Sequence, residues 1–269
     1  MKIDLLLRLA LCILIIVAAP LGARSADDDF RQFRAKDQIE LRPDKAYLLL
    51  RMDTDLYKFH LHVLRIPSDQ EVDDFFEARR EAFEKAGARG SIENFPFNYQ
   101  GKSNFFDLDP KKYISKAGKI ANVLAEVDPG DYVVYGMGYN EYLHQCFCLG
   151  TVGFEAKAGE ITDLGTMITA KAWEPSDIPE LAGETGLGKG AMVDFGLFAV
   201  ALVPSGENSQ FARLNSSKIE PADFHAVGPY TEPNSATINR LAPMPGVLAY
   251  RQGRVIDEAT GKELPPNWQ

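Results

Sequence analysis

The stretch VLAEVDPGDYVVYGMGYNEYLHQCFCLGTVGFEAKAGEITDLGTMI, residues 123–168, decides the fold class. Short runs rich in β-branched and aromatic residues alternate in it with turn residues, a pattern typical of antiparallel β-proteins. The expected strands are Val123–Val127, Tyr132–Met137, Cys146–Ala156 and Ile161–Ile168. Asp128-Pro129-Gly130 and Ala158-Gly159-Glu160 are among the turns that separate them. We therefore expect a mainly β fold, an antiparallel β-sandwich.

Toward the N-terminus, two further strand-like runs flank the short polar turn Asp53-Thr54-Asp55. They are Ala46–Met52 and Leu56–Ile66, and they suggest a β-hairpin. In the second run, alternation places Phe59, Leu61 and Val63 on one face of the strand, with Lys58, His60 and His62 on the other.

One amphipathic α-helix interrupts the β pattern at residues 69–86. Ser68 and Glu71 have the spacing of a capping box, and Gly87 supplies the stop signal. Apolar residues recur at steps of three and four, so we expect the helix to pack Phe75, Phe76 and Phe83 onto the sheet. The aromatic-rich segment that follows, residues 90–119, is expected to be a loop pinned by its aromatic rings, with a ligand platform as the alternative.

The C-terminal third has fewer signals. Met192–Val203 is an apolar run suited to a buried strand. Val247–Arg251 and Arg254–Asp257, joined by Gln252-Gly253, predict a hairpin. We expect residues 39–170 to form the sandwich and residues 171–269 a β-rich extension packed on the same domain.

Residues 1–25 have the pattern of a signal peptide, with a basic start, the apolar run Leu9–Ala19 and small residues before Ala26. Cleavage after Ser25 is expected, with an uncleaved anchor as the alternative, and residues 26–38 read as a polar tether. Cleavage changes the net charge from −9 to −11, because it leaves 26 basic and 37 acidic residues. The mature chain is thus expected to be periplasmic or secreted, without a transmembrane span and without nucleic acid as a partner.

Two segments carry a resemblance to a known family. Val127-Asp128-Pro129-Gly130-Asp131-Tyr132-Val133-Val134 and Phe154-Glu155-Ala156-Lys157-Ala158-Gly159-Glu160-Ile161 resemble transthyretin-like or carboxypeptidase-regulatory-like β-sandwich modules of bacterial envelope proteins. In those modules a Pro-Gly-x-Tyr turn opens a strand. The resemblance implies an exported β-sandwich of structural or binding character, with no shared catalytic set, and it makes the helix an insertion.

Known catalytic motifs are missing. Gly183–Gly190 approaches a phosphate-binding loop but lacks the Ser or Thr that must follow Lys189, so no nucleotide is expected. The sequence contains no Gly-x-Ser-x-Gly elbow, and Ser205 in Pro204-Ser205-Gly206 reads as a turn residue.

The most distinctive local feature is His144-Gln145-Cys146-Phe147-Cys148. On a strand, residues 144, 146 and 148 would share one face, and His60 with His62 forms a second pair of this kind. Cys146 and Cys148 are therefore disulfide or redox candidates. Together with His60, His62 and His144 they are also candidate metal ligands, while two packed thiols are the third alternative.

From the sequence we therefore expect an exported, non-enzymatic envelope module with a binding or structural role, and no cofactor. Its partner would be an envelope protein or a cell-wall component. One alternative is a hydrolase acting on envelope sugar or peptide, and another is a small redox or metal-handling protein using Cys146 and Cys148.

Overall fold

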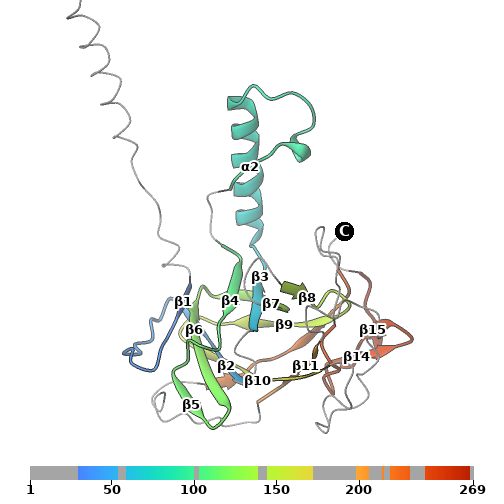
Figure 1. Ribbon diagram of the computed structural model, residues 1–269. Helices are drawn as coiled ribbons and strands as arrows, with labels where there is room; N and C mark the ends of the chain where they lie inside the picture. The colour runs from blue at the N-terminus through green and yellow to red at the C-terminus, as the bar shows by residue number, and fades with distance from the viewer. Residues whose placement is uncertain are drawn as a thin grey trace, which may run out of the picture.

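A computed structural model describes residues 30–53, 59–99, 103–138, 144–171, 198–205, 214, 219–230 and 240–266. The predicted signal peptide and the Gly183–Gly190 loop lie outside these residues. The described chain is mainly β, with several sheets and one α-helix (Figure 1). None of its helices is long and apolar enough to span a membrane.

The first large sheet is mixed rather than purely antiparallel. Its strand order is β1 (Phe30–Gln32), β6 (Ile120–Val127), β2 (Ala46–Asp53), β10 (Ile161–Lys171) and β11 (Phe198–Val203), with β5 (Ser115–Ala117) beside β6 and β12 (Ile219–Pro221) beside β10. β10 runs parallel to β2 and to β12, whereas the other pairs are antiparallel.

The second large sheet is antiparallel throughout. Its order is β13 (His225–Val227), β9 (Thr151–Ala156), β7 (Gly130–Gly138), β3 (His60–Arg65) and β4 (Phe105–Leu108), with β8 (His144–Cys146) beside β7. A small third sheet contains β14 (Leu248–Arg251), β15 (Arg254–Asp257) and β16 (Lys262–Glu263).

Both large sheets contribute to one hydrophobic core. Its buried members include Leu48 and Val123 from the first sheet, Val63 and Phe154 from the second, and Leu248 from the third. The predicted inward face of the β3 region is confirmed, because Phe59, Leu61 and Val63 all belong to this core. The C-terminal residues therefore pack on the same core as residues 46–167.

The predicted hairpin around Asp53-Thr54-Asp55 is wrong. β2 belongs to the first sheet and β3 to the second, so the chain crosses between sheets at this point. Alternation could not distinguish the two cases, because Leu48 and Leu61 face the same core whether their strands pair or lie in opposite sheets. The C-terminal hairpin is confirmed: β14 and β15 pair across Gln252 and Gly253, both with positive φ.

The predicted tether does not extend over residues 30–33. β1 pairs with β6 there, and Phe33 is completely buried against Tyr47 and Leu124. Two phenylalanines within a polar stretch are enough to attach it to the sheet, because each buries a large apolar ring.

Ser205 helps to fix a bulge in the parallel pair β2–β10. The guanidinium of Arg51 donates to Ser205 and Thr166 and to both oxygens of the fully buried Asp163. The β2–β10 register shifts between Asp163 and Thr166. Gly165, with φ +92°, occupies the bulge, where a Cβ would lie 2.1 Å from the carbonyl oxygen of Val203. Ser205 is therefore a structural residue here.

Candidate binding site on the α2 arm

The helix is inserted between two neighbouring strands of the second sheet. α2 spans Asp69–Lys85, in agreement with the predicted range, and the capping box between Ser68 and Glu71 is present. Because β3 and β4 pair directly, the chain between them leaves the sheet at the end of β3 and returns to it at the start of β4. We call α2 with residues 86–99 the arm.

The prediction that α2 packs on the sheet is wrong. No residue of α2 is buried, and the helix stands away from the sheets (Figure 1). One of its faces is covered by the returning chain instead: the ring of Phe75 lies 5.8 Å from that of Phe97, and the ring of Phe83 lies 5.4 Å from that of Phe95. Phe76 remains 58% exposed. Helical spacing predicts an apolar face but does not say which segment covers it.

The returning chain is also held by polar contacts. Residues Ile92–Asn94 form the short 3-10 helix η2, which is capped by the side chain of Ser91. The guanidinium of Arg79 donates to the carbonyl groups of Glu93 and Phe95. The loop expected over residues 90–119 is wrong for part of this range, because β4 and β5 lie within it. Its first part, residues 90–99, is pinned as expected, and the element it is pinned to is α2.

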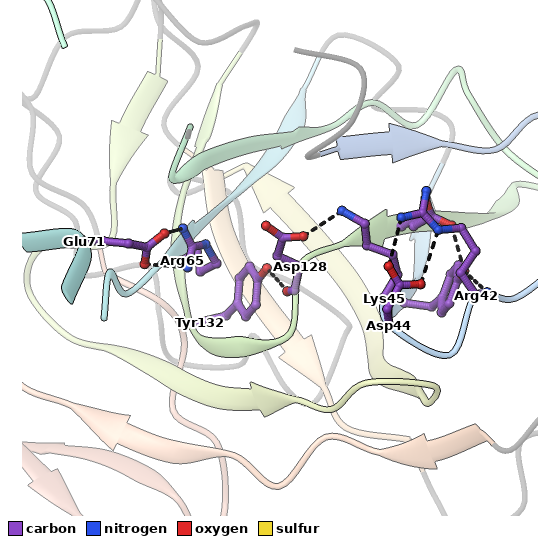
Figure 2. Close-up of polar contacts among 9 residues, drawn as sticks. Arg42, Asp44, Lys45, Arg65, Glu71, Asp128 and Tyr132 are labelled. Atoms are coloured by element: carbon purple, nitrogen blue, oxygen red, sulfur yellow. Dashed lines mark hydrogen bonds and ion pairs between the residues drawn. The ribbon is translucent and has the colours of Figure 1, made fainter. Parts of the chain in front are cut away.

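A bidentate ion pair fixes the base of the arm. Arg65, at the end of β3 and 6% exposed, donates to both carboxylate oxygens of Glu71 at 2.9 and 2.6 Å (Figure 2). It also donates to the side chain of Asn104 at 3.2 Å. Arg65 lowers the pKa of Glu71 to about 2. The side chain of Arg65 thus joins the strand before the arm, the first turn of α2 and the residue that precedes β4.

Further polar contacts continue from this base along the body (Figure 2). The hydroxyl of Tyr132 donates to the carbonyl of Asp128 at 2.5 Å, and the carboxylate of Asp128 pairs with Lys45 at 2.6 Å. Burial raises the pKa of Tyr132 and raises that of Tyr47 to about 12. The side chains of Tyr132, Asp128 and Lys45 are thus engaged in structural contacts within the body of the protein.

The outer surface of the arm combines exposed apolar side chains with negative charge. Val72, Phe76 and Tyr99 are the large apolar residues exposed there. α2 has three basic residues against seven acidic ones, which are Asp69, Glu71, Asp73, Asp74, Glu77, Glu81 and Glu84. Such a surface favours an apolar partner with a basic rim.

Cys146 and Cys148 are joined by a disulfide, with their Cα atoms 5.1 Å apart. The expectation that residues 144, 146 and 148 share one strand face is wrong, because β8 ends at Cys146 and Cys148 lies in the following turn. Both cysteines are fully buried in a cluster with Tyr135 and Tyr230. The turn also holds the C-terminal chain, since Cys148 accepts a backbone hydrogen bond from Tyr230.

The structure brings some of the candidate metal ligands onto neighbouring strands but does not bring them together into one site. β3 and β8 flank β7, so His60 and His144 align with Gly138, and His62 and Cys146 align with Gly136. His60 contacts Asp107 at 2.7 Å, and the buried ring of His62 lies 4.9 Å from that of Phe105. The side chain of His144 lies outside the described residues, and within them no group of three or more His, Cys, Asp or Glu is placed to hold a metal ion.

Sequence reasoning missed the Arg65–Glu71 pair and the Asp107 partner of His60. The capping pattern did single out Glu71, but as a partner of Ser68 alone. Asp107 lies 47 residues from His60, and no local pattern connects the two.

Comparison of the chain with protein-family models, with curated proteins and with solved structures gave no match.

Proposed function

We propose that this protein is an exported, non-enzymatic envelope module that binds a partner protein through the arm. The exposed aromatic surface of an arm with no buried residue in its helix carries the proposal. Isolated helices of this length have only marginal stability in water. The returning chain covers one face of α2, and Phe76 lies outside that covered face and remains exposed. A large exposed aromatic side chain on a projecting element is typical of an interaction site.

The partner that fits is a protein surface with an apolar pocket and a basic rim. The negative charge of α2 supports this choice, since it attracts Lys and Arg side chains and repels both anionic lipid and the arm of a second copy. A basic partner also suits the acidic mature chain as a whole.

The envelope location rests on the signal pattern of residues 1–25, and the module character on a sandwich arrangement that we propose for the two large sheets. Support for the sandwich comes from the shared core and from Tyr132, whose hydroxyl bonds to the backbone four residues upstream, as the tyrosine corner of β-sandwiches does. The resemblance to envelope modules agrees with both. The intact mass of the native protein tests export, and a chain beginning at Ala26 is the expected result.

The redox alternative receives less support. Thiol–disulfide exchange requires access of an attacking thiolate to a sulfur atom, and both cysteines are fully buried. No specific observation favours the hydrolase.

The binding role can be tested with a photo-crosslinking amino acid placed at Phe76 in cells. Lys85 is the matched control, because nine residues, about two and a half turns, put it on the opposite face of α2. The expected result is one adduct from position 76 and none from position 85. The partner, identified and purified, should bind the wild-type protein more weakly as salt rises, and Phe76→Asp should weaken it by about tenfold or more.

Equal adducts at both positions would contradict the proposal, as would binding of the purified partner that Phe76→Asp leaves unchanged. Adducts between two copies of this chain would replace the basic partner with self-association. Circular dichroism at 222 nm verifies that the variant keeps α2.

A further inference from the structure

The exposed apolar side chains of the arm lie in the half that adjoins the body of the protein. Val72 and Phe76 belong to the first half of α2, which follows β3. Tyr99 lies in the returning chain, and its ring is 5.2 Å from that of Phe75, which is in turn 5.5 Å from that of Phe76. A partner that covers these side chains therefore contacts the arm near its base rather than at its tip.

The charge of α2 is divided between its two halves. Residues 69–77 contain five carboxylates and no lysine or arginine, whereas residues 78–85 contain two carboxylates and three basic side chains. One of the five carboxylates, Glu71, is bound by Arg65 and belongs to the anchor of the arm. The negative potential of α2 is thus strongest in the half that carries Phe76.

Asp69 and Asp73 share a face of α2 with Val72 and Phe76. The four residues are separated by steps of three and four, so their side chains are neighbours on the helix surface. Both carboxylates are exposed, as are Val72 and Phe76. A group that docks on this face therefore meets an aromatic ring and a carboxylate together.

A guanidinium group is complementary to both. It is planar and weakly hydrated, so it stacks on an aromatic ring, and its N–H groups can donate to a carboxylate at the same time. A lysine ammonium is compact and strongly hydrated, so it gains less from the ring. The covered face of α2 already contains such a stack, since the guanidinium of Arg79 lies 5.9 Å from the centroid of the Phe75 ring.

We propose that the partner presents an arginine side chain that stacks on Phe76 and pairs with Asp73. This inference rests on the proposed function and specifies the chemistry of the basic rim. The guanidinium lies against the exposed ring of Phe76 and donates to the carboxylate of Asp73, while apolar groups of the partner cover Val72. The tip of the arm takes no part in the contact.

Fluorescence anisotropy with the full mature protein at low salt tests the proposal. The probes are short blocked peptides of equal length in which leucine alternates with arginine, with lysine or with citrulline. The arginine peptide should bind about threefold or more tightly than the lysine peptide. Citrulline has nearly the shape of arginine without its charge, and its peptide should bind about tenfold or more weakly than the arginine peptide.

Three variants locate the arginine. Phe76→Leu keeps an apolar side chain but removes the ring, so it should abolish the preference for arginine over lysine. Asp73→Asn should weaken binding of both charged peptides by about threefold. Asp74→Asn is the matched control and should change binding by less than about 1.5-fold. It removes the same charge one residue further on, about 160° from Phe76 around the helix, whereas Asp73 is about 60° away.

The proposal would be overturned by equal binding of the arginine and lysine peptides, or by an arginine preference that persists in Phe76→Leu. Equal weakening by Asp73→Asn and Asp74→Asn would also overturn it, because it would mean general attraction to an acidic helix. Photo-crosslinking at position 76 distinguishes this failure from failure of the proposed function. An adduct there with no arginine preference removes only the arginine, whereas the absence of an adduct removes the binding role itself.

Discussion

Phe75 and Phe76 are neighbours on α2 with opposite environments. The ring of Phe75 contacts the rings of Phe97 and Tyr99 at 5.8 and 5.2 Å, whereas Phe76 is 58% exposed. Phe76→Asp should therefore change the free energy of unfolding by less than about 0.5 kcal/mol. Phe75→Asp should destabilise the arm by about 1 to 3 kcal/mol, because it removes partly buried apolar surface and two ring contacts.

Thermal unfolding followed at 222 nm measures both variants, since α2 is the only α-helix among the described residues. A loss of helix in Phe76→Asp as large as in Phe75→Asp would show that α2 is covered on both sides.

Glu71 gives the arm a pH-dependent attachment. Its pKa falls from 4.5 to about 2 because Arg65 binds the carboxylate in the folded chain. A depressed carboxyl pKa contributes stability that is complete above pH 4.5 and is lost as the pH falls toward 2. Glu71→Gln should therefore be less stable than wild type at pH 6, and the difference should shrink progressively between pH 4.5 and 2.

The helical signal as a function of pH and temperature provides this measurement. Glu77→Gln is the matched control, because Glu77 is exposed and reaches only Arg80, at 3.4 Å. A difference between Glu71→Gln and wild type that persists unchanged at pH 2 would rule out the ion pair as the anchor of the arm.

Among the elements, the arm behaves as an addition to the second sheet. β3 and β4 already pair from Leu61↔Leu108 to Leu64↔Phe105, so a tight turn can replace the excursion between them. A variant in which Asn-Gly replaces residues 67–102 should keep the core and unfold cooperatively, with the signal of α2 removed. Loss of cooperative unfolding would mean that the arm is part of the folding unit.

The Cys146–Cys148 turn should be protected in the folded chain. Both residues are fully buried, so a mild reductant followed by alkylation should label them only when the protein unfolds. Cys146→Ser with Cys148→Ser should destabilise the protein by only about 1.5 kcal/mol on the loop-entropy model, because the closed loop is very short. If Cys146 and Cys148 were labelled in native buffer as fast as the thiols released from a small-molecule disulfide, the result would support the redox alternative.

Local sequence signals predicted where the elements begin and end better than they predicted which segments pack against those elements. The α2 range and its capping box follow from residues within one turn of each other, and the C-terminal hairpin follows from Gln252-Gly253. The covering of α2 depends on Phe95 and Phe97, which interrupt a segment without periodicity. The candidate arm was therefore foreseen as a helix, but its exposed side was predicted to be buried.

In the whole molecule, the errors in strand pairing have one origin: alternation identifies which residues face a core but not which sheet a strand joins. β2 and β3 were expected to pair and instead lie in different sheets. The parallel pairing of β10 with β2 also left no trace in the sequence, because buried strands read the same in both directions.

The parallel pairing of β2 with β10 has a consequence for the timing of folding. The Arg51–Asp163 contact joins residues 112 positions apart, so β2 cannot complete its place in the sheet until β10 has been synthesised. Domains dominated by such distant pairings fold slowly, over about milliseconds to seconds. For the export that we propose, this delay would be an advantage, because slow folding leaves time for the polypeptide to pass through a translocation channel while still extended.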